Sequence, residues 1–263
     1  MKSIRLFDDE IYATSDLNHY VGLHPKLTRI QEGAINIDGK YQFCEPVFDV
    51  TSSNISSDSL YLTITTRCGM VVNYFFDGNL FVLISESSIP GAHFLSCAIS
   101  SHFSIVLANS ADCVYMFDLT SGFLLRIYET KTPIKLTKFC ETNDFIVLCE
   151  DNLIHVLDTH FSVYNTINVD DKVTSLSVCD SVLWFEKTPF VTGHESGTVN
   201  VWTLDMEAID EEIDETRKES KILRKKVQMF TLAKPFEKPI VAIEQIHDYT
   251  DVVCINEDGE ACV

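Results

Sequence analysis

The sequence predicts an all-β protein built as a propeller, in which four-stranded sheets stand as blades around an axis. The apolar segments are only five to eight residues long and rich in β-branched and aromatic residues, which favours strands over helices. A hairpin pattern also recurs along the chain at intervals near those of propeller blades. With 263 residues, of which 46% are apolar, the chain can form its own core as a single domain over residues 1–263.

One hairpin provides the template for the repeat. Residues 190–204 contain an apolar strand, a tight turn at Ser196 and Gly197, and an alternating strand that closes on Trp202. The pattern recurs at residues 105–117, 145–157, 71–83, 251–263, 37–44 and 3–8. It closes at positions 7, 44, 83, 117, 157 and 202, and the copy at 251–263 stops one residue short of its closing position. The first five intervals are 34 to 45 residues, close to the length of a four-stranded blade, and the sixth is longer because it contains residues 205–226.

This spacing predicts seven blades. The remaining apolar segments, residues 135–139, 173–178 and 240–243, are expected to be strands that precede the hairpins. Ser3 is expected on the third strand of the first blade, and Val263 within the last blade. Both terminal blades are therefore expected to be incomplete, as in a fragment of a larger protein.

Residues 205–226 differ in composition from the repeats. They contain eight acidic and six basic residues, no Gly and no Pro, and the acids precede the bases. This order favours a helix dipole, so a charged and partly helical insertion between blades is expected. Two interpretations stay open: a solvated loop, or a docking surface for a basic partner. The acidic residues of that surface would be Asp210, Glu211, Glu212, Asp214 and Glu215.

Charge narrows the expected partners. The chain has 20 Lys and Arg residues against 39 Asp and Glu residues, a net charge of −19. Such a surface repels nucleic acids and anionic lipids, and no apolar run is long enough for insertion into a membrane. The nine cysteines form no Cys-x-x-Cys motif, which indicates reduced thiols rather than a zinc site. Proteins are therefore the expected partners, and the cytoplasm is the expected location.

The sequence shows no catalytic, cofactor-binding or metal-binding set. Glu195 stands where a nucleophile elbow needs serine, and Thr198 stands where a zincin motif needs its second histidine. His155 is expected to be a strand residue rather than a base. The sequence thus predicts a protein that is not an enzyme and binds no cofactor. The alternative is a propeller hydrolase whose central-channel site is assembled from distant loops.

Several segments carry a family resemblance. Residues 110–119 (SADCVYMFDL) are similar to a WD40 hairpin with Phe117 in the usual place of tryptophan. Residues 93–110, then 182–202 with their VTGHESG and VNVW runs, and then the charged insertion occur in an order typical of one WD40 subgroup. Residues 3–7 (SIRLF) are similar to an early strand of that subgroup. The chain resembles the degenerate C-terminal WD40 propeller of BEACH-domain proteins.

This resemblance implies a non-catalytic scaffold in membrane trafficking, lysosomal processes or autophagy. Its partners would include a BEACH domain of the parent polypeptide, and it would reach endomembranes only through partners. The His/Ser/Trp/Asp hydrogen-bond set of standard WD40 blades is mostly missing, so no blade is assigned that network. The residues expected to anchor the blades are Phe7, Phe117, Asp118, Asp158, Gly193, His194, Gly197 and Trp202.

Overall fold

The computed structural model describes residues 3–7, 10–14, 19–23, 26–31, 34–37, 40–43, 50–58, 60–77, 81–130, 132–141, 144–178, 190–208, 223–245 and 251–263. Strands joined by short turns make up these ranges, which contain no α-helix. The segments that form strands are those rich in β-branched and aromatic residues, which suit a pleated, half-buried surface. The prediction of an all-β protein is confirmed.

The strands follow one another closely along the chain. They are β1 (Ser3–Phe7), β2 (Glu10–Thr14), β3 (His19–Leu23), β4 (Lys26–Gln31), β5 (Ala34–Ile37), β6 (Lys40–Phe43), β7 (Val50–Ile55), β8 (Tyr61–Thr66), β9 (Met70–Phe76), β10 (Phe81–Ser88), β11 (Ser96–Ser100), β12 (Ile105–Asn109), β13 (Cys113–Asp118), β14 (Leu124–Glu129), β15 (Leu136–Cys140), β16 (Phe145–Cys149), β17 (Leu153–Leu157), β18 (Val163–Asn168), β19 (Val173–Val178), β20 (Phe190–His194), β21 (Val199–Ala208), β22 (Leu223–Ala233), β23 (Ile240–Gln245), β24 (Val252–Asn256) and β25 (Ala261–Cys262).

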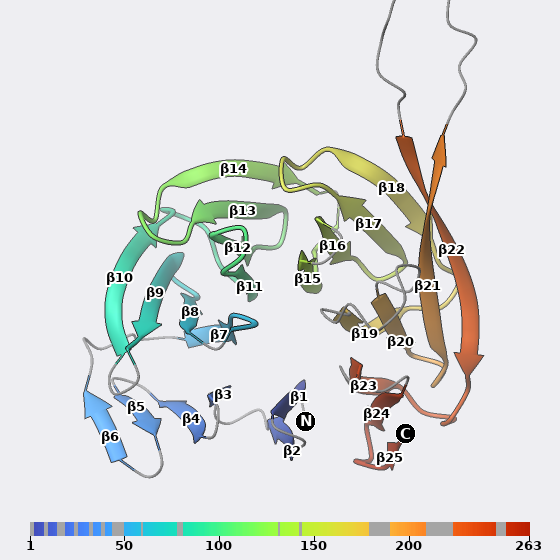
Figure 1. Ribbon diagram of the computed structural model, residues 1–263, viewed down its shortest axis with the longest axis horizontal. Helices are drawn as coiled ribbons and strands as arrows, with labels where there is room; N and C mark the ends of the chain where they lie inside the picture. The colour runs from blue at the N-terminus through green and yellow to red at the C-terminus, as the bar shows by residue number, and fades with distance from the viewer. Residues whose placement is uncertain are drawn as a thin grey trace, which may run out of the picture.

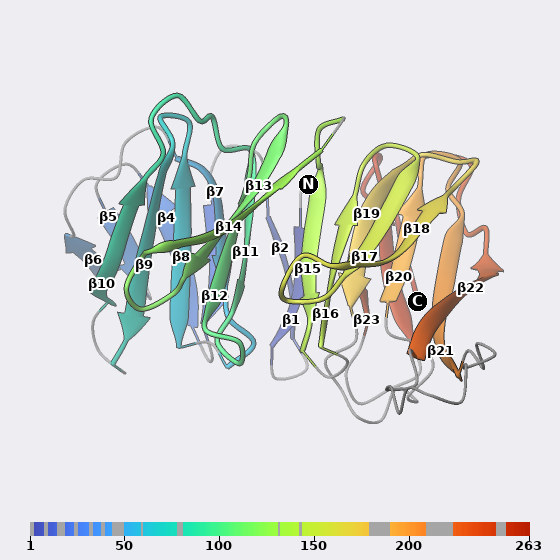
Figure 2. The same ribbon diagram turned by 90° about the horizontal axis from the view of Figure 1, so that it is seen from above.

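Consecutive strands pair antiparallel to form separate sheets. Five sheets have four strands (β3–β6, β7–β10, β11–β14, β15–β18 and β19–β22), β23–β25 form a three-stranded sheet, and β1 pairs with β2. Figure 1 shows the sheets around a common centre, with the first strand of each four-stranded sheet inside and the last at the rim. Figure 2 shows them standing side by side. Neighbouring inner strands contact one another from β3 through to β23, and β1 contacts both β23 and β3. The sheets therefore resemble propeller blades.

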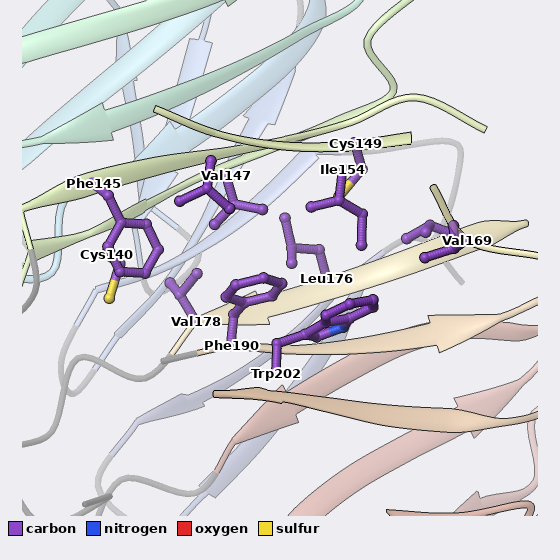
Figure 3. Close-up of a cluster of buried hydrophobic side chains, with 12 residues drawn as sticks. Cys140, Phe145, Val147, Cys149, Ile154, Val169, Leu176, Val178, Phe190 and Trp202 are labelled. Atoms are coloured by element: carbon purple, nitrogen blue, oxygen red, sulfur yellow. The ribbon is translucent and has the colours of Figure 1, made fainter. Parts of the chain in front are cut away.

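The core lies between adjacent sheets rather than inside any one of them. The second strands β12, β16, β20 and β24 are buried along their whole length, which explains why their sequences are nearly continuous apolar runs. Between the β15–β18 and β19–β22 sheets, Phe145 and Val147 face Leu176, Phe190 and Trp202 (Figure 3). Each such large side chain stabilises the fold by about 1.5–3 kcal/mol when fully buried.

Three sheets share one irregularity between their third and fourth strands. One extra residue of the outer strand shifts the pairing register, which makes a β-bulge at the same place each time. The pairs next to the bulge are Tyr74↔Leu83, Phe117↔Leu124 and Leu157↔Val163. Tyr74, Phe117 and Leu157 are therefore equivalent positions, and they recur at about the interval of propeller blades.

This register corrects two predicted hairpins. Residues 71–83 are not the template hairpin, because β9 and β10 are the third and fourth strands of their sheet. The equivalent hairpin is β8–β9, and its blade closes at Tyr74 instead of position 83. Residues 37–44 are displaced in the same way, since β5 and β6 are also third and fourth strands. Apolar residues occupy both third and fourth strands in these places, so composition alone does not distinguish them.

The first strand also lies elsewhere than expected. Residues 3–7 were predicted to be the third strand of a blade. Instead β1 pairs with β2 in a sheet of two strands, and it contacts the innermost strands β23 and β3. Strand character is predictable from SIRLF, but the position of the strand in a sheet depends on partners far away in the sequence.

The charged insertion begins and ends as β-structure. The paired strands β21 and β22 continue outward, with Asp205 opposite Lys226 and Ala208 opposite Leu223. The expectation of a helix is therefore wrong for residues 205–208 and 223–226, where acidic positions of β21 are paired with basic positions of β22. Residues 209–222 lie outside the described ranges. The charge order that suggested a helix dipole is equally compatible with a long hairpin.

A buried hydrogen-bond chain ties the β19–β22 sheet together. The indole Nε1–H of Trp202 donates to Thr192 Oγ1 at 2.8 Å, and this hydroxyl donates to His194 Nε2 at 2.8 Å. His194 Nδ1–H donates to the Asp171 carbonyl at 3.0 Å, and Asn200 Nδ2 donates to His194 Nε2 at 3.0 Å. From the sequence we assigned no blade such a network. The structure contains one in this blade, because Thr192 and His194, both on β20, supply the polar groups.

We predict that Trp202→Ala lowers the free energy of unfolding by about 3–5 kcal/mol, because the indole is 1% exposed and stacks on Phe190 at 5.7 Å between ring centroids. Trp202→Phe keeps an aromatic ring there and loses the N–H donor and part of the ring volume, so it should cost less than Trp202→Ala. Urea titration of both variants measures the difference. A loss below about 1 kcal/mol for Trp202→Ala would contradict this blade register.

A second prediction concerns acid sensitivity. Burial lowers the pKa of His194, against a smaller opposing effect of Asp171. The unfolded chain therefore takes up a proton near pH 6.5 that the folded protein does not bind. Stability is complete above that pH and falls as the pH drops toward the folded-state pKa.

The comparison is between the parent protein and His194→Gln, which cannot titrate. Between pH 7.5 and pH 5.5 the parent should lose more unfolding free energy than the variant, since all other titrating groups are shared. Equal losses in the two proteins would show that His194 does not carry this dependence.

Candidate protein-interaction surface

Two of the expected anchors, Asp118 and Asp158, shape the turns that lead into outer strands. Asp118 Oδ1 accepts hydrogen bonds from the N–H groups of Thr120 (3.1 Å) and Ser121 (2.7 Å). Asp158 Oδ1 likewise accepts from the N–H groups of His160 and Ser162, both at 2.8 Å. The bonds from Ser121 lower the pKa of Asp118, because they favour its charged form. Each carboxylate therefore fixes the start of the outer strand that follows, β14 or β18.

Two glycines sit where the backbone has close neighbours. Gly197 has φ +84° in the β20–β21 turn, and a Cβ there would lie within 3 Å of the Phe236 carbonyl. At Gly193 a Cβ would lie 2.6 Å from Ile240 Cγ2, because β19 and β23 approach β20 closely. Both positions thus require glycine for the packing of neighbouring sheets.

The other expected residues divide into two groups. Phe117, His194 and Trp202 are buried in the core between sheets. Phe7 ends β1, and its packing lies outside the described part of the structure. The acidic positions Asp210, Glu211, Glu212, Asp214 and Glu215 also lie outside it.

A polar chain between the β14 and β17–β18 strands was not anticipated. His155, which lies on β17 as predicted, donates from Nε2 to Glu150 Oε1 at 3.2 Å, and the hydroxyl of Thr166 donates to Nδ1 at 3.2 Å. The second Glu150 oxygen accepts from Thr132, and the Tyr128 ring covers the imidazole at 6.2 Å. These groups satisfy one another's hydrogen bonds within the β15–β18 sheet and the segment that leads into it, and the ring contact of Tyr128 with His155 reaches across from β14.

The described ranges contain no group of three or more His, Cys, Asp or Glu side chains placed to hold a metal ion. They also contain no helix with the length and apolar character needed to cross a membrane. The seven cysteines within the described ranges form no disulfide there. Burial raises the pKa of Cys149 and that of Cys254, the latter to about 11, which keeps both thiols protonated and weakly reactive.

The outer strand β14 exposes an unusual amount of apolar side chain. Phe123 is 75% exposed, and Leu125 and Ile127 are each 49% exposed, although the strands beneath them are buried. Leu124, at 41%, completes this set. We call these four residues the β14 rim. Because β14 is the last strand of its sheet, its outer edge has no strand partner among the described residues. Figure 1 shows it running along the outside of the molecule.

Carboxylates flank the β14 rim at both ends. Asp118 precedes it, one turn before Phe123. At the far end Thr130 N–H donates to the Asp112 carbonyl at 2.8 Å, and Glu129 pairs with Cys113. Burial, Asp112 and then Glu129 raise the pKa of the Cys113 thiol, which shows that both carboxylates act at this end. The rim is thus apolar in the middle and acidic at its ends.

This surface was not predicted from the sequence. LLRIYE has the composition of a core strand, and its exposure follows only from its place as the fourth strand. A usable signal did exist: the segment comes one turn after the blade-closing residue Phe117, where an outer strand is expected. Apolar residues in that place are candidates for a binding surface.

Comparison with known proteins gives a distant relationship. No family model matches the chain. BEACH domain-containing protein A2 of Arabidopsis thaliana is 27% identical over 112 residues, which are 40% of this chain and 3% of that protein. Protein SPIRRIG of the same plant is 29% identical over 112 residues, again 40% and 3%. The chain therefore matches only a small part of these long relatives. It shows weak homology to BEACH-domain proteins, in agreement with the resemblance found in the sequence.

Proposed function

We propose that this chain is the WD40-type propeller of a BEACH-type scaffold protein and acts as a non-catalytic platform for protein binding. The single observation that carries the proposal is the β14 rim, where large apolar side chains stay exposed on a strand whose sheet is otherwise buried. Exposed apolar patches of this kind mark protein-binding sites. The distant homology to BEACH domain-containing protein A2 supports the scaffold class.

The proposal includes a closed ring of seven blades. The two-stranded β1–β2 sheet would be the blade between the β23–β25 and β3–β6 sheets, since β1 contacts the inner strands of both. A ring that closes protects the inner edges of its terminal sheets. The recurrence of the β-bulge in three sheets supports a common blade design.

The partner we propose is the BEACH domain of the parent polypeptide, within the cytoplasm, in membrane trafficking, lysosomal processes or autophagy. The net charge of −19 supports a protein partner with basic surface groups over nucleic acid or anionic lipid. The protein would then reach endomembranes through other proteins.

The test starts from the genomic sequence on both sides of this reading frame, which is expected to encode a BEACH domain. Isothermal titration of that domain with this chain is expected to give a Kd of about 10 μM or lower, a free energy near −7 kcal/mol. Gly197→Ala, which disturbs the β20–β21 turn, is a matched control for dependence on the folded blade. Flanking sequence without a BEACH domain, or a domain that does not bind at 100 μM, would contradict the proposal.

A further inference from the structure

We propose that the β14 rim binds an extended segment of a partner protein, which pairs with β14 as a fifth strand. The segment would have apolar residues in its middle and Lys or Arg at both ends. This inference rests on the proposed platform function and names the chemistry of the partner. Its three supports are the open edge of β14, the apolar residues along it, and the carboxylates at its two ends.

The main chain of β14 is prepared for pairing. The strand is held to β13 at both ends, by Asp118 N–H donating to Phe123 O at 2.9 Å and by Thr130 N–H donating to Asp112 O at 2.8 Å. In an antiparallel pair every second residue directs its N–H and C=O away from its partner strand. These outward groups form a template for an added strand, and fixing them in advance lowers the entropy cost of binding.

Packing keeps β14 in place on its inner side. The Tyr128 ring lies 5.6 Å from Phe161 and 6.2 Å from His155, both of the next sheet. The strand is thus braced at one face while its rim stays open. The neighbouring outer strand β18 differs, because it also contacts β22. Of these two outer strands, β14 therefore offers the freer edge.

The apolar residues lie along the edge at the spacing of an added strand. Leu125 and Ile127 are two residues apart within β14, a strand period of about 6.6 Å, and Phe123 stands directly before the strand. The bulge at Leu125 leaves this residue without a partner on β13. Cross-strand contacts between such residues and β-branched side chains of a partner each contribute roughly 0.2–1 kcal/mol. The middle of the partner segment should therefore be rich in Val, Ile or Phe.

Charge sets the ends of the partner segment. Asp118 stands before the rim, and Asp112 and Glu129 stand at its end. Arg126 is the one basic residue within β14 itself. A segment with Lys or Arg at both ends would place cations near these carboxylates, which favours association and fixes the register.

The experiment uses the whole chain and a fluorescent probe peptide, Lys-Val-Thr-Val-Thr-Val-Lys. Two control peptides separate the contributions. One replaces the central Val by Pro, which keeps the charge but prevents strand pairing. The other carries Glu at both ends. We expect fluorescence anisotropy to give binding at least tenfold weaker for each control peptide than for the probe.

Matched protein variants locate the site. Ile127→Lys on β14 and Val163→Lys on β18 place the same charge on outer strands at residues of similar exposure, 49% and 47%. Ile127→Lys should weaken binding of the probe at least tenfold, and Val163→Lys less than twofold. Ile127→Thr, which keeps strand propensity and adds no charge, should weaken it to an intermediate degree. Circular dichroism checks that all three variants fold.

Amide hydrogen exchange provides an independent readout. Strand addition should slow exchange of the outward N–H groups of β14 at least tenfold, and leave those of β18 unchanged. Equal binding of the Pro peptide, equal loss in Val163→Lys, or absence of binding at 1 mM would each overturn the inference. If the BEACH domain still binds Ile127→Lys normally, the platform function stands and this surface is not the one it uses.

Discussion

The architecture depends on second strands that are buried on both of their faces. β12, β16, β20 and β24 have no exposed side, so each of their sheets needs a neighbour on each flank. Sheets that stand around a common centre, as in Figure 1, meet this need. Contacts between successive inner strands follow from this requirement, as does the location of the apolar clusters between sheets. The outer strands carry no such constraint and are free to differ.

Local sequence predicted the hairpins whose strands are unambiguous. Residues 105–117 and 145–157 form β12–β13 and β16–β17, with Phe117 and Leu157 at equivalent places. The hairpin at 71–83 was misplaced by one strand, because apolar residues fill both β9 and β10 and only long-range pairing tells them apart. The ends of the charged insertion were taken for helix on the same grounds, since register between β21 and β22 is a nonlocal property. Exposure of the β14 rim likewise depends on what the neighbouring sheets leave uncovered.

The hydrogen-bond chain from Trp202 to Asp171 shows a second limit of reading motifs. We compared the sequence with standard WD40 blades and expected the polar partners of the tryptophan at fixed positions of the repeat. Here Thr192 and His194 supply them from two positions of the same strand, on a side chain face that is otherwise apolar. A buried polar group is costly without a partner, so the bonds that join the Trp202 indole, the Thr192 hydroxyl and both His194 nitrogens explain why these groups are tolerated inside the core. The fold therefore needs a hydrogen-bond partner at these places, and residues other than those of the standard motif can supply it.

The bulges of the outer strands have an evolutionary consequence. The bulge residue Leu125 is skipped by the pairing register of β13 and β14 and is 49% exposed, so replacing it disturbs no rung of the ladder. The second strands, by contrast, are locked by packing on both sides. Mutations can therefore accumulate at Leu125 without loss of the fold, and each new side chain there alters what the periphery recognises. After duplication of this domain, changes at a few peripheral codons can alter which ligands it binds. Selection for the fold acts at the same time on the buried residues.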